Sequence, residues 1–300
     1  MEQTARRRSI AVVTCQGLPD WEVDDHHLYR ALDQSGVQWS LVAWDDSEVE
    51  WAHFGLVLLR TPWDYTDRSD VFRDWVRRVG DLGTLTNPSE VVLWNLNKTY
   101  LASLEQAGIP IAPSRWVARG APIDLAQLID EAGWSRAFIK PQIGATARLT
   151  MPFSRDNVRE AQAFIDEHAA REGMIIQPYL ESVEREGELS LIYFGGVLSH
   201  CVRKVPVEGD YRVQDDFGAR DFPVDAEIEA VRIGEKALSA AERICGISTP
   251  LAYGRVDFLR GPRGEYFLNE LELVEPSLFF RHRPAAAEQL VAVCLSRMVG

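Results

Sequence analysis

The stretch that most constrains this chain runs from Tyr253 to Pro276 and reads YGRVDFLRGPRGEYFLNELELVEP. Polar and apolar residues alternate from Tyr253 to Leu259, which predicts a strand. The tetrad Gly-Pro-Arg-Gly at 261–264 predicts a chain reversal, because proline presets one turn dihedral and glycine permits the next. Residues 265–274 predict the returning strand. The stretch therefore predicts a β-hairpin.

Three carboxylates are expected to meet on one face of this hairpin. Side chains two residues apart on a strand share a face, which groups Glu270 with Glu272, and pairing across the hairpin adds Asp257 and Arg255. Carboxylates this close repel one another unless a cation lies among them. Mg²⁺ suits such oxygens together with substrate phosphates, so the pattern predicts a metal site. A solvated hairpin with surface glutamates is the alternative, and Glu275 is interpreted as a spectator.

Composition and charge narrow the class of protein. The chain has 300 residues, enough for two or three domains, and its hydrophobic share of 46% is typical of a globular protein. A net charge of -13 argues against a nucleic-acid partner, because a phosphate polymer requires a basic surface. The four cysteines form no CxxC pair, which favours reduced thiols and a cytoplasmic location. No stretch has the length of a transmembrane helix, so no membrane partner is expected.

The first third of the chain predicts a parallel α/β domain. Residues 9–14, 37–44 and 54–59 read as strands with a helix between the first two. Asp24 and Asp25 are interpreted as caps of that helix rather than as metal ligands. Ligands gather where parallel strands end, and the loop RTPWDY follows the third strand. Its candidates for binding an amino-acid-like substrate are Arg60, Thr61, Asp64 and Tyr65, with a tightly packed loop as the equal alternative.

Two lysines stand where they could bind phosphate. Lys98 begins a predicted helix, although a lone lysine there is normally a surface residue. Lys140 ends a predicted strand and precedes PQIGATA, a loop whose small residues allow a phosphate close to backbone N–H groups. The Walker sequence GxxxxGK[ST] is absent. The strand at 174–180 is broken by Pro178, and the freed backbone groups could pair with a purine edge.

The order of these features along the chain, the two lysines, the strand broken at Pro178 and the hairpin acids, resembles that of the ATP-grasp superfamily. The resemblance is closest to the branch with glutathione synthetase and the ribosomal-protein glutamate ligases. The resemblance covers nearly the whole chain. It implies an α/β protein, with α+β in the lid: an N-terminal parallel-sheet domain followed by two α+β subdomains that sandwich ATP. The implied divisions are residues 1–110 for the N-terminal domain, 111–180 for a central lid, and 181–300 for the C-terminal subdomain with the metal site.

The resemblance also implies roles for single residues. The expected cofactors are ATP and Mg²⁺, with two ions expected and Mn²⁺ as a substitute. Glu272 departs from the usual E-x-N pattern, and Gln214 stands where asparagine is more usual. The implied phosphate ligands are Lys98, Lys140 and the Gly144 loop; the implied adenine contacts are Gln177, Pro178, Tyr179 and Leu180, with Glu181 or Glu184 at the ribose. The implied catalytic residues are Lys204, Arg212 and Arg255, Gln214 is a substrate contact, and the metal ligands are Asp257, Glu270 and Glu272.

The phrases RTPWDY, GDYRVQ and ELELVEPSLF resemble, more narrowly, the cyclo-ligases of D-cycloserine biosynthesis, which close O-ureido-D-serine into its ring. This resemblance implies an ADP-forming ligase of antibiotic biosynthesis. It would activate a small amino-acid-like carboxylate as an acyl phosphate for attack by nitrogen. A two-substrate carboxylate-amine (peptide-type) ligase and a non-catalytic ATP-binding module are the alternatives. A homo-oligomer is compatible with the sequence.

Overall fold

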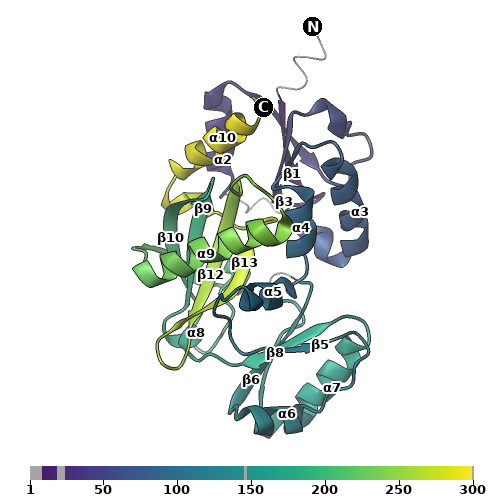
Figure 1. The fold of residues 1–300 in the computed structure, drawn as a ribbon, viewed down its shortest axis with the longest axis vertical. Helices are drawn as coiled ribbons and strands as arrows, with labels where there is room; N and C mark the ends of the chain where they lie inside the picture. The colour runs from purple at the N-terminus through teal and green to yellow at the C-terminus, as the bar shows by residue number, and fades with distance from the viewer. Residues whose placement is uncertain (1–8, 19–23, 145–146, 299–300) are drawn as a thin grey trace.

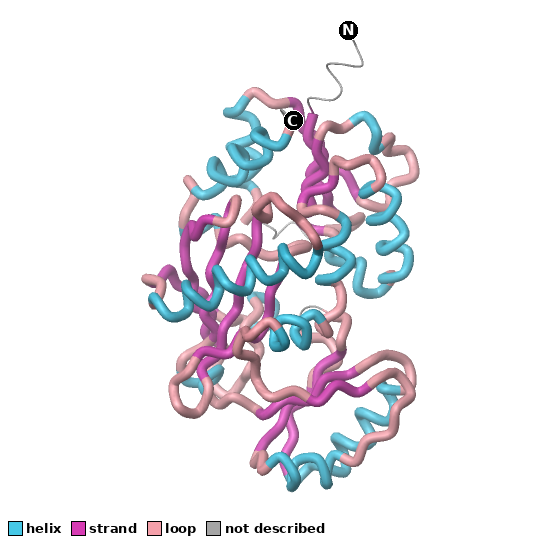
Figure 2. The backbone as a smooth tube through the Cα atoms, in the orientation of Figure 1, coloured by secondary structure: helices cyan, strands magenta, loops and turns pink. Residues whose placement is uncertain are grey.

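The computed structural model describes residues 9–18, 24–144 and 147–298, and its described part contains three β-sheets. Figure 1 shows them one below another, with the N-terminal sheet at the top and the smaller antiparallel sheet at the bottom. The same sheets appear in magenta in Figure 2, with helices against their outer faces. Ala145 and Thr146 of the predicted phosphate loop lie outside the described residues.

The N-terminal sheet is parallel and has the order β2-β1-β3-β4. Successive side chains of β1 point to opposite layers, as expected for a strand buried on both faces. Ile10 packs with the helices α2 and α10, whereas Ala11 packs with α3. The elements of this layer are β1 (Ser9–Thr14), α2 (His26–Ser35), β2 (Gln38–Ala43), β3 (Leu56–Thr61), α3 (Ser69–Gly80), β4 (Leu85–Thr86), α4 (Ser89–Asn95) and, from the far end of the chain, α10 (Ala286–Arg297).

The prediction that the Asp25 side chain caps the helix α2 is wrong. Asp25 occupies the N-cap position of α2 but makes no side-chain bond to the helix backbone. Its carboxylate instead accepts hydrogen bonds from Arg60 in β3. A charged partner 35 residues away in the chain has therefore displaced the local cap.

The smaller antiparallel sheet has the order β5-β8-β6-β7 and is covered on one face by α6 and α7. Ile139 joins the core under these helices, while its neighbours Phe138 and Lys140 line a cavity on the other face. The elements are β5 (Arg115–Val117), α6 (Leu125–Ala132), β6 (Arg136–Pro141), β7 (Met151–Ser154), α7 (Val158–Ala169) and β8 (Met174–Pro178).

The larger antiparallel sheet, β11-β10-β9-β12-β13, packs one face against α9 and α5. The predicted hairpin is confirmed: β12 and β13 pair with Arg255 opposite Glu272 and Asp257 opposite Glu270. The elements are α5 (Tyr100–Gln106), α8 (Ser182–Arg185), β9 (Glu188–Phe194), β10 (Val197–Val205), β11 (Arg220–Val224), α9 (Ile228–Cys245), β12 (Tyr253–Arg260) and β13 (Tyr266–Glu272). The described residues contain no helix long and apolar enough to cross a membrane.

The sequence pattern predicts no strand at residues 220–224, where the structure has β11. It contains Pro223, which cannot donate a ladder hydrogen bond. The strand lies at the edge of the sheet and pairs only with β10. An edge position tolerates the missing N–H, and the sheet therefore extends one strand further than expected. The domain divisions at 110/111 and 180/181 remain predictions.

Candidate active site

A cavity of about 540 Å³ is lined by residues from all three layers. It brings together side chains from positions as far apart in the chain as Asp24 and Arg281. The predicted site residues in its wall are Tyr65, Lys98, Lys140, Gly144, Gln177, Pro178, Tyr179, Leu180, Lys204, Arg212, Gln214, Arg255, Glu270 and Glu272.

The three predicted metal ligands converge on the hairpin. Asp257, Glu270 and Glu272 each offer a carboxylate oxygen, and these oxygens lie within 4.8 Å of one another. Burial, together with repulsion from Glu270 and Asp257, raises the pKa of Glu272 to about 8 despite the nearby Arg255. An added cation would stabilise the charged form of a carboxylate whose pKa is raised in this way. Three carboxylates also form the oxygen donor set that Mg²⁺ prefers. The residues present therefore fit the predicted ion.

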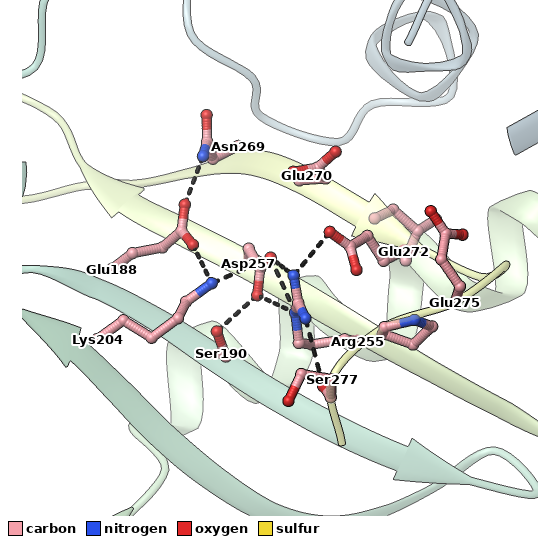
Figure 3. Close-up of polar contacts among 12 residues, drawn as sticks. Glu188, Ser190, Lys204, Arg255, Asp257, Asn269, Glu270, Glu272, Glu275 and Ser277 are labelled. Carbon is pink, nitrogen blue, oxygen red and sulfur yellow. Dashed lines mark hydrogen bonds and ion pairs between the residues drawn. The ribbon is translucent and has the colours of Figure 1, made fainter. Parts of the chain in front are cut away.

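Protein cations also pair with these acids (Figure 3). Arg255 Nη2 lies 2.9 Å from Asp257 Oδ2 and 2.7 Å from Glu272 Oε1. Lys204 Nζ pairs with Glu188 and lies 3.5 Å from Asp257 Oδ2. Burial alone would raise the pKa of Asp257, but Arg255 and Lys204 outweigh it and hold the pKa below its ordinary value. The carboxylate of Asp257, which is not among the residues of the cavity wall, is thus kept in its charged form.

The two predicted phosphate lysines line the same cavity and contact residues of β13. Lys98 Nζ lies 2.5 Å from Glu270 Oε1 and donates to the Gly144 carbonyl at 2.8 Å. Lys140 Nζ is 3.5 Å from Asn269 Oδ1, and burial lowers the pKa of its ammonium to about 8. An anion bound between the lysines and the acids would stabilise the charge on Lys140.

The predicted adenine contacts lie in one wall, beside an aromatic cluster. Gln177 donates to Ser114 Oγ at 2.9 Å, and the rings of Phe138 and Tyr211 meet edge to face with centroids 5.0 Å apart. The two ribose candidates are the exception, because neither Glu181 nor Glu184 lines the cavity. Glu184 instead accepts a hydrogen bond from the Tyr179 hydroxyl.

The loop before β11 supplies two predicted residues with different surroundings. Arg212 pairs with Asp210 at 2.7 Å and its guanidinium lies 3.9 Å from the centroid of the Phe217 ring. With 38% of its side chain exposed, Arg212 keeps access to the cavity. Gln214 Oε1 is buried and has no hydrogen-bond partner among the described residues, so it is available to a donor from a bound molecule.

For the loop RTPWDY the geometry favours the packed alternative. Arg60 is 2% exposed and donates to Asp25 and to the Pro276 carbonyl. Thr61 bonds to Thr14 at 2.9 Å, and neither it nor Arg60 nor Asp64 lines the cavity. Asp64 accepts from the Trp44 indole at 2.7 Å. Tyr65 is the one predicted residue of this loop in the wall, and Trp63 accompanies it.

Glu275, interpreted as a spectator, lines the cavity, and the Tyr65 side chain lies beside its carboxylate. Burial raises the pKa of Glu275 to about 7, although Tyr65 and Lys98 favour the charged form. Residues 273–276 leave the strand alternation after β13. No periodicity could therefore show which way this side chain points.

Sequence and structure comparisons agree on the origin of this arrangement. Residues 10–87 match the family model for the N-terminal domain of D-cycloserine synthetase DcsG. The cycloserine biosynthesis protein DcsG of Streptomyces lavendulae is 34% identical over 260 residues, which is 84% of this chain and 86% of that protein. The chain belongs to the D-cycloserine synthetase DcsG family.

Solved structures extend the match to the whole fold. A crystal structure of D-cycloserine synthetase DcsG covers 97% of this chain and 99% of its own, with a TM-score of 0.89 at 29% identity. The ATP-grasp ligase PsnB, solved with a minimal precursor, Mg and ADP, covers 95% of this chain and 98% of its own, with a TM-score of 0.63 at 16% identity. The latter likeness shows the fold alone.

The predicted family and fold class are thereby confirmed. The chain has the ATP-grasp fold, in which an N-terminal parallel sheet is followed by two antiparallel-sheet subdomains. As a homologue of DcsG it is an ATP-grasp ligase that forms a carbon–nitrogen bond. Relatives with this fold bind adenine nucleotide and Mg. The individual site residues remain predictions.

Proposed function

We propose that this chain is an ADP-forming ligase that closes O-ureido-D-serine to D-cycloserine, using ATP and Mg²⁺. One observation carries the proposal: the acid face of a DcsG-family hairpin and the lysines Lys98 and Lys140 border the same cavity. Acids suited to a divalent cation and amines suited to phosphate are the two halves of a nucleotide-phosphate site. A nucleotide-binding module without chemistry would not require the additional Arg255 and Arg212.

The first chemical step activates the substrate carboxylate. A carboxylate oxygen attacks the γ-phosphorus of ATP, the bond to the β-phosphate oxygen breaks, and ADP leaves an acyl phosphate behind. Lys98 and Lys140 bind the phosphate oxygens, and Arg255 lies on the hairpin where negative charge accumulates. Asp257, Glu270 and Glu272 would hold the metal, which when bound neutralises charge on the phosphates. Two ions are proposed, and Mn²⁺ could replace them.

The second step forms the carbon–nitrogen bond. The ureido nitrogen that is bonded to oxygen attacks the acyl carbon and loses its proton, and inorganic phosphate leaves. Water then cleaves the bond from this nitrogen to the carbamoyl carbon, and the carbamoyl group leaves as carbon dioxide and ammonia. Because the nitrogen belongs to the same molecule, no second amine enters the cavity. Arg212 and Arg255 are proposed to stabilise the oxyanion, with Lys204 holding Asp257 in place. The subdomain that carries Lys140 is proposed to close as a lid, since an acyl phosphate hydrolyses in water.

Product analysis with the purified protein tests the proposal. With Mg-ATP and O-ureido-D-serine we expect ADP and phosphate in equal amounts without any added amine. Hydroxylamine should divert the acyl phosphate to a hydroxamate. ADP release that requires a separate amine would overturn cyclisation in favour of a two-substrate ligase. Absence of ADP release with O-ureido-D-serine and with a panel of other amino acids would overturn the ligase assignment to this substrate class.

A cytoplasmic site of action is part of the proposal. All four cysteines are free thiols in the structure, and three of them, Cys15, Cys201 and Cys294, are buried. Such thiols are compatible with a reducing compartment. The homo-oligomer remains a prediction.

A further inference from the structure

The cavity has two chemically different halves. One half contains the lysines Lys98 and Lys140 and the adenine wall described above. The other half is built from the loop after β3, which supplies Trp63 and Tyr65, and from the segment after β13, which supplies Glu275, Ser277 and Phe279. The hairpin acids lie between the halves. A carboxylate that receives the γ-phosphate must therefore extend into the second half with the rest of its molecule.

Glu275 is a cavity-lining carboxylate for which the described residues provide no ion-pair partner. Glu270 is paired with Lys98, and Glu272 with Arg255. Asp24, which also lines this half, already has partners within the protein. Its carboxylate accepts a hydrogen bond from the Ser277 hydroxyl and forms an ion pair with Arg281 at 3.3 Å. Figure 3 shows Glu275 beside Glu272, with no dashed contact to a cation.

Two neighbours from the loop after β3 hold Glu275 in this position. Trp63 Nε1 donates to its backbone carbonyl at 3.4 Å, and the Tyr65 side chain lies beside its carboxylate. Tyr65 is 6% exposed, so its ring is fixed in the core of the N-terminal layer. The side chain is thus held in place before any ligand arrives, as a recognition group must be.

Glu275 is half-buried, and a carboxylate partly removed from water without a counter-ion is destabilised until a cation or a proton joins it. An amino-acid substrate carries such a cation one bond from the carbon that bears its carboxylate. A carboxylate–ammonium hydrogen bond is charge-assisted and stronger than a neutral one. We propose that Glu275, oriented by Tyr65, binds the α-ammonium group of the substrate and makes the enzyme select amino acids over acids that lack an amino group. The inference rests on the proposed function, because it assigns a contact in the same cavity.

A cycle of two enzymes and two substrates tests this assignment. Glu275→Gln keeps the size and shape of the side chain but removes its charge. The substrates are O-ureido-D-serine and the analogue in which hydrogen replaces the α-ammonium. We expect wild-type kcat/KM to favour the amino substrate by about 10- to 100-fold. Glu275→Gln should reduce this preference toward one, by losing activity on the amino substrate and little on the analogue.

Glu105→Gln is the matched control, because Glu105 is exposed on α5 and lies outside the cavity wall. It should leave both activities unchanged. An equal loss on both substrates in Glu275→Gln would show a structural or general catalytic role and overturn the assignment. Unchanged preference would overturn it as well.

A wrong substrate and a wrong assignment of Glu275 give different results in this experiment. If wild type releases no ADP with O-ureido-D-serine, that substrate is wrong, and the same cycle is run with other amino acids and their desamino analogues. A preference for the amino form that disappears in Glu275→Gln would then still support the ammonium site. Equal use of both forms by wild type would refute it.

Discussion

The buried ion pair between Arg60 and Asp25 offers the sharpest test of how the substrate side of the protein is built. Arg60→Met removes the guanidinium but keeps most of the side-chain volume. The structure predicts that this change unfolds the N-terminal layer more readily rather than weakening substrate binding. This result distinguishes the two interpretations of RTPWDY, in which the loop either packs in the core or binds the substrate.

The expected loss of unfolding free energy follows from the burial of the Arg60–Asp25 ion pair. Arg60 and Asp25 are 2% and 1% exposed, and Arg60 Nη2 lies 2.8 Å from Asp25 Oδ1. Arg60 also donates to the Pro276 carbonyl at 3.1 Å, which ties β3 to the segment after the hairpin. Removing one partner of a buried pair leaves an uncompensated charge and costs about 3–5 kcal/mol. The free energy of unfolding should therefore fall by that amount.

The pH dependence provides an internal check. Burial raises the pKa of Asp25 above its ordinary value even with Arg60 present. Without Arg60 the carboxyl should bind a proton more readily in the folded state than in the unfolded state. A raised folded pKa stabilises the protein at low pH and loses that effect as pH rises. The destabilisation of Arg60→Met should accordingly be smaller at about pH 5 than at pH 7.

Urea unfolding followed by circular dichroism measures these differences. Arg77→Met is the matched control, because the Arg77–Asp74 pair on α3 has side chains 58% and 75% exposed. Such a pair contributes roughly 0–1 kcal/mol. Asp25→Asn combined with Arg60→Met should recover part of the loss, since the stranded charge is gone. A loss below about 1 kcal/mol, or a raised KM at unchanged stability, would refute the packed-loop reading.

Three further predictions concern the site and the large sheet. Glu270→Gln should lower kcat for ADP release by roughly 100-fold or more at an unchanged unfolding midpoint, because the metal loses a ligand; wild-type activity with Mg-ATP would contradict the metal assignment. Since burial lowers the pKa of Lys140 to about 8, its ammonium is lost above that pH, and calorimetry should show ATP affinity falling between about pH 7 and 9 in wild type but not in Lys140→Arg. Burial lowers the pKa of His200 to about 4, so stability should be full above about pH 6.5 and decrease as pH falls toward 4, by roughly 2 kcal/mol. His200→Gln should remove that slope, and an identical acid slope in this variant would assign it to other groups.

Parts of the site were readable from the sequence because strands repeat every two residues. That period places Glu270 and Glu272 on one face. The pairing of Asp257 with Glu270 also depends on a register shift between Asp257 and Phe258, which the turn at 261–264 does not set. The lysines Lys98 and Lys140 were identified by their place relative to predicted elements and by resemblance. Periodicity could not show that Glu184 turns to the Tyr179 hydroxyl, away from the cavity.

The sequence by itself determined the alternating layers of the fold, the hairpin and the identity of its acid face, because these depend on contacts close in the chain or on a regular period. Only the tertiary structure decided which polar residues face the cavity. Arg60 is held by Asp25, while Glu275 lies in the cavity wall beside Tyr65. These partners are about 35 and 210 residues away along the chain. No local propensity encodes such a choice, since each side chain takes its direction from the group that the fold places next to it.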